Sequence, residues 1–113
     1  AFHSPLMESA QYGLGTYLSD LPIHTPSCPI VTNVTARPTA DVREIRRNLI
    51  QQITAPVMWK QTMDFLKENE VSLVVEVGPG KVLSNLAKRE MQPEQVVNLD
   101  TLADVETFVV VTV

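Results

Sequence analysis

The 113-residue chain has little of several features that mark particular protein classes. Its single cysteine, Cys28, excludes an internal disulfide framework and is typical of a reducing compartment. The net charge of −4 gives no reason to expect nucleic acid or an anionic membrane as a partner, since both require a basic surface. No apolar run reaches the ~18 residues of a membrane span, and no signal peptide is indicated. We therefore expect a cytoplasmic globular protein.

Helical and extended patterns alternate along the chain, and its 44% hydrophobic composition suffices for a modest core. The spacing of apolar and turn residues predicts helices over 5–21, 41–53, 56–70 and 81–90, and strands over 29–35, 71–77 and 95–99. The nearly continuous apolar run 71–77 is typical of strands buried on both faces of a parallel sheet. With a last helix after the strand 95–99, the order α-β-α-α-β-α-β-α predicts an α/β fold with a mostly parallel sheet flanked by helices. The apolar tail 108–113 is of β type and has no evident role.

The first residues, Ala1-Phe-His-Ser-Pro-Leu-Met7, place a histidine just before a helix. Ser4 suits the N-cap, and Pro5 suits the first helical position because its missing N–H is not needed there. His3 is then held beside rigid structure while its ring can face a cleft, as a general base requires. The alternative for such a histidine is a capping or packing role.

Two further segments can contribute to a site. Residues 51–57 lie where one helix ends and Pro56 begins the next, so main-chain carbonyls are left unpaired that a histidine N–H could satisfy. Glu76-Val-Gly-Pro-Gly-Lys-Val-Leu83 is a strand, a glycine turn and a helix start, which can offer N–H groups to a phosphate. It lacks the spacing of a dinucleotide site or a P-loop, which favours a simple tight turn. We expect no metal site, since His24 and Cys28 lack a second pair of ligands.

Three segments together resemble the bacterial malonyl-CoA:acyl carrier protein transacylases in order and separation. They are Ala1-Phe-His-Ser-Pro-Leu-Met7, Gln52-Ile-Thr-Ala-Pro-Val-Met-Trp59 and Glu76-Val-Gly-Pro-Gly-Lys-Val-Leu83. The resemblance covers nearly all of the chain and leaves out only 108–113. It implies that residues 1–113 are a single incomplete domain, the C-terminal part of an α/β-hydrolase-like large subdomain.

Enzymes of this family move a malonyl group from coenzyme A to the phosphopantetheine thiol of acyl carrier protein in fatty acid biosynthesis, through an acyl-serine and without a cofactor. His3 matches the family's general base, which deprotonates the serine and protonates the leaving thiol. Gln52 matches the glutamine whose backbone carbonyl accepts the other imidazole N–H. Phe2 matches the bulky residue that favours malonyl over methylmalonyl groups by ~1–3 kcal/mol. The resemblance thus implies catalytic roles for His3 and Gln52 and a substrate-binding role for Phe2.

The serine part of such a site is not in this sequence, since no G-x-S-x-G occurs. The family's arginine for the malonyl carboxylate and its ferredoxin-like subdomain belong to the same upstream region. Ser4 cannot replace the serine, because adjacent side chains at a helix start point apart and Ser4 suits capping. We therefore expect the chain to be inactive by itself and to need the N-terminal half of the enzyme as a partner.

Acyl carrier proteins are acidic, so the resemblance also implies a locally basic docking surface. The candidates lie on two predicted helices: Lys81, Lys88 and Arg89, and Arg43, Arg46 and Arg47. For each set, an ordinary solvated helix face is an equally good interpretation.

Two other functions stay open. One is an acyltransferase domain of a polyketide synthase, although such domains often carry a Ser-Pro-His-Pro type of turn where this chain has Gly78-Pro79-Gly80-Lys81. The other is a non-catalytic module that binds acyl carrier protein. A G-H-S-x-G upstream of this segment would favour the enzyme over the module.

Overall fold

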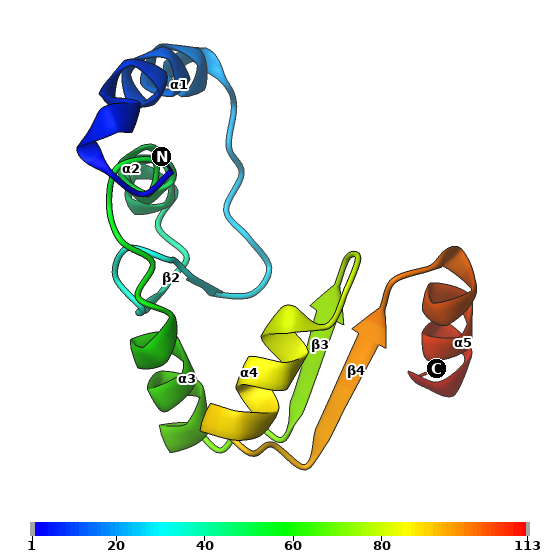
Figure 1. Ribbon diagram of the computed structural model, residues 1–113. Coiled ribbons are helices and arrows are strands. Elements are labelled where there is room, and N and C mark those ends of the chain that lie inside the picture. The colour runs from blue at the N-terminus through cyan, green and yellow to red at the C-terminus, as the bar shows by residue number, and fades with distance from the viewer. Residues whose placement is uncertain (1, 113) are drawn as a thin grey trace. The chain divides into compact units, whose positions relative to one another are not determined.

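A computed structural model describes residues 2–112 of the chain and the side chains of residues 2–108 (Figure 1). The chain forms two compact units, Ala1–Thr62 and Met63–Val113. The first unit contains the 3₁₀-helix η1 (Pro5–Met7), α1 (Glu8–Asp20), β1 (Ile30–Val31), β2 (Pro38–Thr39) and α2 (Val42–Gln51). Helix α3 (Trp59–Glu68) begins in the first unit and ends in the second, which contains β3 (Leu73–Val77), α4 (Val82–Glu90), β4 (Gln95–Leu99) and α5 (Leu102–Thr112). The predicted α/β class is confirmed, and the single domain over residues 1–113 stays a prediction.

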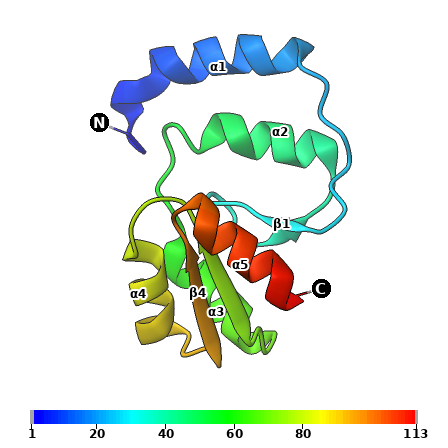
Figure 2. The same cartoon turned by 90° about the vertical axis from the view of Figure 1, so that its right-hand side faces the viewer.

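The first unit is built on α1 and α2, which pack against one another (Figures 1 and 2). Leu18 of α1 and Ile45 of α2 are buried, which follows from their place on the apolar side of each helix. Helix α2 begins where the Asp41 carboxylate accepts the Glu44 N–H at 2.8 Å, as an N-cap residue does. This bond fixes the start of α2, and the Gln11 side chain donates to the Ile50 carbonyl near its end.

The strand predicted over 29–35 is much shorter in the structure. β1 ends at Val31 and pairs antiparallel with β2, so the expectation of a mostly parallel sheet is wrong for this unit. The chain turns after β1 because the Ala36 N–H donates to the Thr32 carbonyl at 3.0 Å, with Ala36 in the left-handed region at φ 52°. Asn33 lies in this turn, and asparagine favours turns over strands.

The second unit is a βαβ arrangement. β3 and β4 pair in parallel, with Val75 opposite Val97, and α4 connects them as a parallel pair requires. Asn98 of β4 bonds to Ser84 of α4, whereas the neighbouring Val97 and Leu99 line a cavity with residues of α5. Because side chains alternate along a strand, α4 and α5 lie on opposite faces of the sheet (Figure 2).

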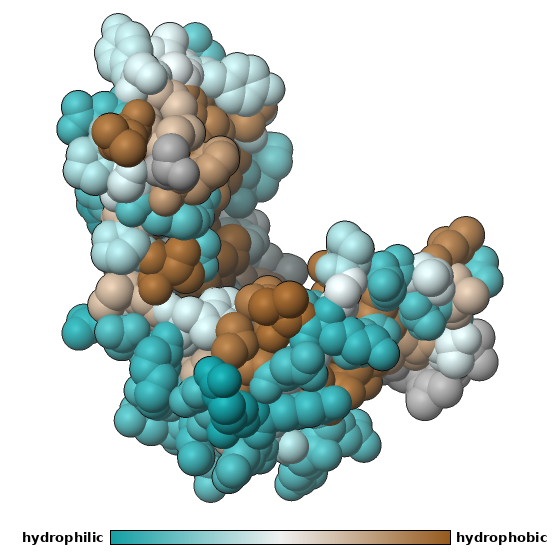
Figure 3. All heavy atoms as spheres, viewed as in Figure 1, coloured by the Kyte–Doolittle hydropathy of each residue, from teal (hydrophilic) through white to brown (hydrophobic). Residues whose placement is uncertain are grey.

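The expectation that the strand 71–77 is buried on both faces is wrong in this chain. Leu73 is 41% exposed and Val77 is 74% exposed, because within the described residues β3 has β4 as its one neighbouring strand. Val82 and Leu83 in the first turn of α4 are also exposed, and Figure 3 shows apolar spheres, in brown, over this end of α4. The carboxyl end of β3 and the start of α4 thus present an apolar surface.

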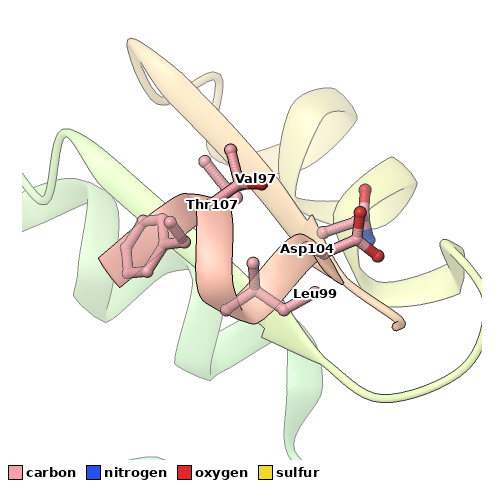
Figure 4. Close-up of a pocket in the computed structure, with 6 residues that line it drawn as sticks. Val97, Leu99, Asp104 and Thr107 are labelled. Carbon is pink, nitrogen blue, oxygen red and sulfur yellow. The ribbon is translucent and has the colours of Figure 1, made fainter. Parts of the chain in front are cut away.

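The tail predicted to be of β type is helical through Thr112, and Val113 lies outside the described residues. Asp104 and Thr101 form a reciprocal cap at the start of α5. Asp104 Oδ2 accepts the Thr101 N–H at 2.7 Å, and Thr101 Oγ1 accepts the Asp104 N–H at 3.2 Å. This cap starts a helix that overrides the β preference of the valines. Between α5 and β4 lies a cavity of about 310 Å³, into which Val97 and Thr107 point (Figure 4).

Cys28 is exposed and precedes β1 in a segment without helix or strand. Within residues 2–112, no helix has the length and apolar character that would let it cross a membrane.

Candidate active site

The end of α2 leaves main-chain carbonyls without partners in the helix. Helix α2 ends at Gln51, and the Ala55 N–H turns back to donate to the Gln51 carbonyl at 3.0 Å. The last carbonyls of an α-helix have no N–H further along the same helix to accept. In this turn the carbonyls of Gln52, Ile53 and Ala55 are therefore available to another segment.

His3 forms hydrogen bonds with all three of these carbonyls. Its main-chain N–H donates to the Ile53 oxygen at 3.0 Å, and its ring Nδ1 lies 2.8 Å from the Gln52 oxygen and 3.1 Å from the Ala55 oxygen. A carbonyl oxygen only accepts hydrogen bonds, so Nδ1 carries the ring proton. In the neutral ring, Nε2 then holds a lone pair that can accept a proton.

The backbone of His3 is in the left-handed region, at φ 62°. This conformation costs on the order of 1–3 kcal/mol for a residue with a side chain, and it persists only where the surroundings impose it. Here it directs the main-chain N–H and the ring of one residue toward the same turn. Ser4 then has extended backbone at the N-cap position, without a side-chain capping bond, and Pro5 begins the 3₁₀-helix η1, so the helix predicted from residue 5 becomes α-helical at Glu8.

Gln11 provides a further bond from the N-terminal segment to the end of α2. Its Nε2 donates to the Ile50 carbonyl at 3.3 Å.

The C-terminal end of a helix carries a partial negative charge, which interacts favourably with a cation placed beside it. The end of α2 therefore both orients the His3 ring and suits the positive charge that the ring acquires when Nε2 takes a proton.

Phe2 stands beside the histidine ring. The two ring centroids are 6.5 Å apart and the ring planes are tilted by 53°. Phe2 is 69% exposed, so its ring does not belong to the core of the unit. The structure thus brings together His3, Gln52 and Phe2, the three residues to which the sequence analysis gives site roles.

Asn33 also contacts this site, although the sequence analysis does not single it out. Its Nδ2 donates to Gln52 Oε1 at 3.2 Å, and its main-chain oxygen accepts the Met58 N–H at 2.8 Å. The second bond keeps residues 56–58 out of the helix that was predicted to start at Pro56, so α3 begins at Trp59. The signal in the sequence was an asparagine inside a β-branched run, which indicates a break in the strand.

The glycine turn belongs to the second unit. Gly78 has φ 132° and Gly80 has φ 91°, both values that residues with a Cβ rarely adopt. The Gly78 N–H donates to the Leu99 carbonyl at 3.0 Å, which continues the pairing of the two strands into the turn. The backbone angles of this turn therefore require glycine at positions 78 and 80.

The Glu76 carboxylate occupies the amides at the start of α4. It accepts the Leu83 N–H at 3.1 Å, the Ser84 N–H at 2.8 Å and the Asn98 side chain at 2.9 Å. The Ser84 hydroxyl and these donors hold the pKa of Glu76 below its ordinary value, against the opposing effect of desolvation. Because these amides are already bonded, the structure favours the tight-turn interpretation over a phosphate site.

Comparison with known proteins identifies the family. A malonyl CoA-acyl carrier protein transacylase of Haemophilus influenzae is 34% identical over 111 residues, which are 96% of this chain and 36% of the relative. The solved structure of an acyl-carrier-protein S-malonyltransferase from Bartonella henselae matches with a TM-score of 0.87 and 32% identity, over 97% of this chain and 35% of that one. The chain belongs to the malonyl-CoA:acyl carrier protein transacylase family. No protein-family model matches it.

The matched region corresponds to the C-terminal part of the transacylases, as the sequence analysis predicts. The chain spans about a third of the length of the curated transacylase from Haemophilus influenzae that it matches. Two further matches concern polyketide synthesis. Polyketide biosynthesis protein ThaF of Burkholderia thailandensis is 38% identical over 89 residues, or 79% of this chain and 8% of the relative. A malonyl-transacylase solved in complex with a type II polyketide acyl-carrier protein matches with a TM-score of 0.79 and 31% identity, over 92% of this chain and 34% of that one.

The basic residues proposed for carrier-protein docking do not form one cluster on α4. Lys81 is at the N-terminal end of this helix, whereas Lys88 and Arg89 are in its last turn, about 10 Å further along at 1.5 Å per residue. Arg89 is paired with Glu90 at 2.7 Å. On α2, Arg46 is half-buried and donates to the Leu21 carbonyl at 3.0 Å, so it braces α1.

The expectation that His24 and Cys28 form no metal site stays a prediction. Within residues 2–112, no three histidine, cysteine or acidic side chains gather in a way that could hold a metal ion.

Proposed function

We propose that this chain supplies the general base of a malonyl-CoA:acyl carrier protein transacylase. The observation that carries the proposal is the pairing of His3 Nδ1 with the main-chain oxygens of Gln52 and Ala55, which leaves Nε2 as the basic atom. The family match supports the same role, since the motif that contains His3 lies within the matched region. The nucleophilic serine comes from the part of the transacylase fold that this chain does not match.

In the first half-reaction, His3 Nε2 accepts the proton of the serine hydroxyl while the serine oxygen bonds to the carbonyl carbon of malonyl-CoA. The carbon–sulfur bond then breaks, and the imidazolium returns the proton to the departing coenzyme A thiolate. In the second half-reaction, Nε2 takes the proton of the phosphopantetheine thiol, and the sulfur attacks the acyl-serine. The ester bond breaks and the serine oxygen recovers the proton, which restores the starting state.

The neutral carbonyl of Gln52 takes the place that a carboxylate has in serine hydrolases. It fixes the tautomer and orientation of the ring but stabilises the imidazolium less than a carboxylate does. A thioester has a good leaving group, so a weaker base suffices. The reaction needs no cofactor, and coenzyme A enters as part of the substrate.

Three finer assignments belong to the proposal. Phe2 narrows the acyl pocket and so favours malonyl over methylmalonyl groups. Acyl carrier protein is the acceptor, which the solved complex of a related malonyl-transacylase with its carrier protein supports. The parallel strands β3 and β4 belong to an α/β-hydrolase-like sheet that the rest of the transacylase fold continues.

The proposal is tested by complementation. The part of the Haemophilus influenzae transacylase that this chain does not match is supplied as a separate polypeptide, the complementing segment, and the two together form the assembled enzyme. We expect the chain alone and the complementing segment alone to be inactive, and the assembled enzyme to transfer radiolabelled malonyl groups from coenzyme A to acyl carrier protein. Transfer by the chain alone would show that the roles are wrongly assigned. An assembled complex that binds acyl carrier protein without transfer would instead favour a non-catalytic binding module.

A second candidate is the same chemistry within polyketide synthesis. The match to ThaF at 38% identity favours it, whereas Gly78-Pro79-Gly80-Lys81 favours the discrete fatty-acid enzyme. Offering the assembled enzyme equal amounts of a fatty-acid and a polyketide carrier protein separates the two. Faster loading of the fatty-acid carrier supports the first candidate, and faster loading of the polyketide carrier supports the second.

A further inference from the structure

The turn that follows β1 is a rigid support beside the candidate active site. Asn48 of α2 is 2% exposed, and its Nδ2 donates to Thr32 Oγ1 at 3.1 Å. The Thr32 hydroxyl also bonds to the Thr35 hydroxyl at 2.9 Å, and the Thr32 carbonyl accepts the Ala36 N–H. Asn33 lies within this turn, so its position is fixed from the buried interior of the unit.

From that support, Asn33 holds both ends of the segment 52–58. Its side chain bonds to the Gln52 side chain at the start of the segment, and its main-chain oxygen bonds to the Met58 N–H at the end. The two carbonyls that orient the His3 ring belong to this segment: Gln52 is its first residue, and Ala55 lies in its middle. The segment is therefore tied at each end to one residue.

The space next to this contact is not filled by side chains. A cavity of about 150 Å³ is lined by Asn33, Gln52, Asn48 and residues of β1. Side chains in a well-packed interior are held by many contacts, each of ~0.1–0.2 kcal/mol, and a cavity removes part of them. The hydrogen bond from Asn33 is thus a principal restraint on the Gln52 side chain on this side.

We propose that Asn33 is a positioning residue that orients His3 by fixing residues 52–58 through Gln52 and Met58. The inference rests on the proposed role of His3 as the base, but it concerns a different residue and a different contact. Loss of the Asn33 side chain frees the Gln52 side chain to turn, so Asn33 holds the segment 52–58 at Met58 only, and the Gln52 and Ala55 carbonyls no longer keep the ring in one orientation. A displacement of this kind reduces the rate of the chemical step and leaves substrate binding unchanged.

The first test observes the ring without using activity. The chain is labelled with ¹⁵N, alone and in the assembled enzyme, and the ring nitrogens of His3 are recorded, with exposed His24 as the internal reference for a free ring. We expect the Nδ1–H form for His3 in the parent chain, and signals shifted toward those of His24 in Asn33→Ala. Asn33→Asp should restore the parent signals, because the Gln52 amide can turn over and donate from Nε2 to the carboxylate. Parent signals in a folded Asn33→Ala chain would overturn the proposal.

Gln52→Met removes the same hydrogen bond from its other end while keeping the main-chain carbonyl that His3 uses. It should shift the His3 signals as Asn33→Ala does, and the double variant should add little to either single change, since both remove one interaction. This variant decides the question if Asn33→Ala fails to fold. Additive effects would mean that Asn33 does not act through Gln52.

The second test measures malonyl transfer by the assembled enzyme. Asn33→Ala should lower kcat about tenfold with KM for malonyl-CoA unchanged, whereas Asn69→Ala should change neither. Asn69 bonds to the Phe65 carbonyl at 2.8 Å on the exposed end of α3 and serves as the matched asparagine control. Unchanged kcat with unchanged ring signals would reject the positioning role and leave the proposed function intact. Shifted ring signals without loss of kcat would keep the contact and reject His3 as the base.

Discussion

The two ends of helices that carry this chain's most specific motifs meet the same physical requirement in opposite ways. At the end of α2, unpaired carbonyls are satisfied by the N–H and the ring of His3. At the start of α4, unpaired N–H groups are satisfied by the Glu76 carboxylate. Each residue comes from another segment of the chain, and each satisfies main-chain groups that have no partner within their own helix.

The difference lies in which atoms remain available. His3 uses Nδ1 for the carbonyls, and its second ring nitrogen on the exposed side stays able to exchange a proton. Glu76 directs one carboxylate oxygen to the Leu83 N–H and the other to the Ser84 N–H and the Asn98 side chain. A helix end closed by imidazole therefore keeps a reactive atom, whereas one closed by a fully bonded carboxylate is structural.

Changing each of the two residues to glutamine tests whether the two helix ends differ in function. His3→Gln keeps a side-chain N–H for the carbonyls but has no basic atom, so kcat of the assembled enzyme should fall by about 10²–10⁴-fold. Glu76→Gln should leave kcat per folded molecule unchanged and lower the midpoint of thermal unfolding, because its amide group presents a donor to a donor. Rates of malonyl transfer and melting curves of both variants test this. Equal losses of kcat in the two variants would remove the distinction between the two helix ends.

The sequence was sufficient to find the helix end that meets His3, because local signals and tertiary contacts agree there. Pro5 begins η1, and the chain between α2 and Pro56 leaves carbonyls that a histidine can satisfy, although α3 begins at Trp59 and not at Pro56. The strand over 95–99 was also predicted with the bounds that the structure has. These elements depend on residues close to them in the chain.

The features that the sequence did not reveal depend on contacts made elsewhere. The strand over 29–35 stops early because Ala36 and Thr32 close a turn, which Asn48 of α2 supports through the Thr32 hydroxyl, 16 residues away. The apolar tail forms a helix because Thr101 and Asp104 cap it, which outweighs the β preference of its valines. The exposure of Val77 follows from which strands are present beside it, and the sequence of one strand cannot report that.

A smaller effect is expected from the aromatic ring beside the base. Phe2→Ala should reduce the preference of the assembled enzyme for malonyl over methylmalonyl groups by at most about 10–200-fold, since one methyl group is worth ~1–3 kcal/mol in a pocket. Competition between malonyl-CoA and methylmalonyl-CoA measures the preference. Tyr12→Ala is the matched control, because Tyr12 is an aromatic residue that is 81% exposed on α1. An unchanged preference in Phe2→Ala would mean that this helix end supplies the base alone and does not select the substrate.

The smallest effect concerns the structural helix end and appears with pH. Hydrogen bonds from Ser84, Leu83 and Asn98 lower the pKa of Glu76 from its ordinary value of 4.5. Its carboxylate therefore stabilises the fold fully above pH 4.5, and this stabilisation is lost as the pH falls through the lower pKa of the folded state. Melting curves of the chain should show Glu76→Gln a few degrees below the parent near neutral pH, with the gap closing in acid, and Glu94→Gln, an exposed glutamate of the same unit, should follow the parent throughout. A gap that stays constant with pH would mean that the charge of Glu76 contributes nothing and that the α4 end is held by the glycine turn alone.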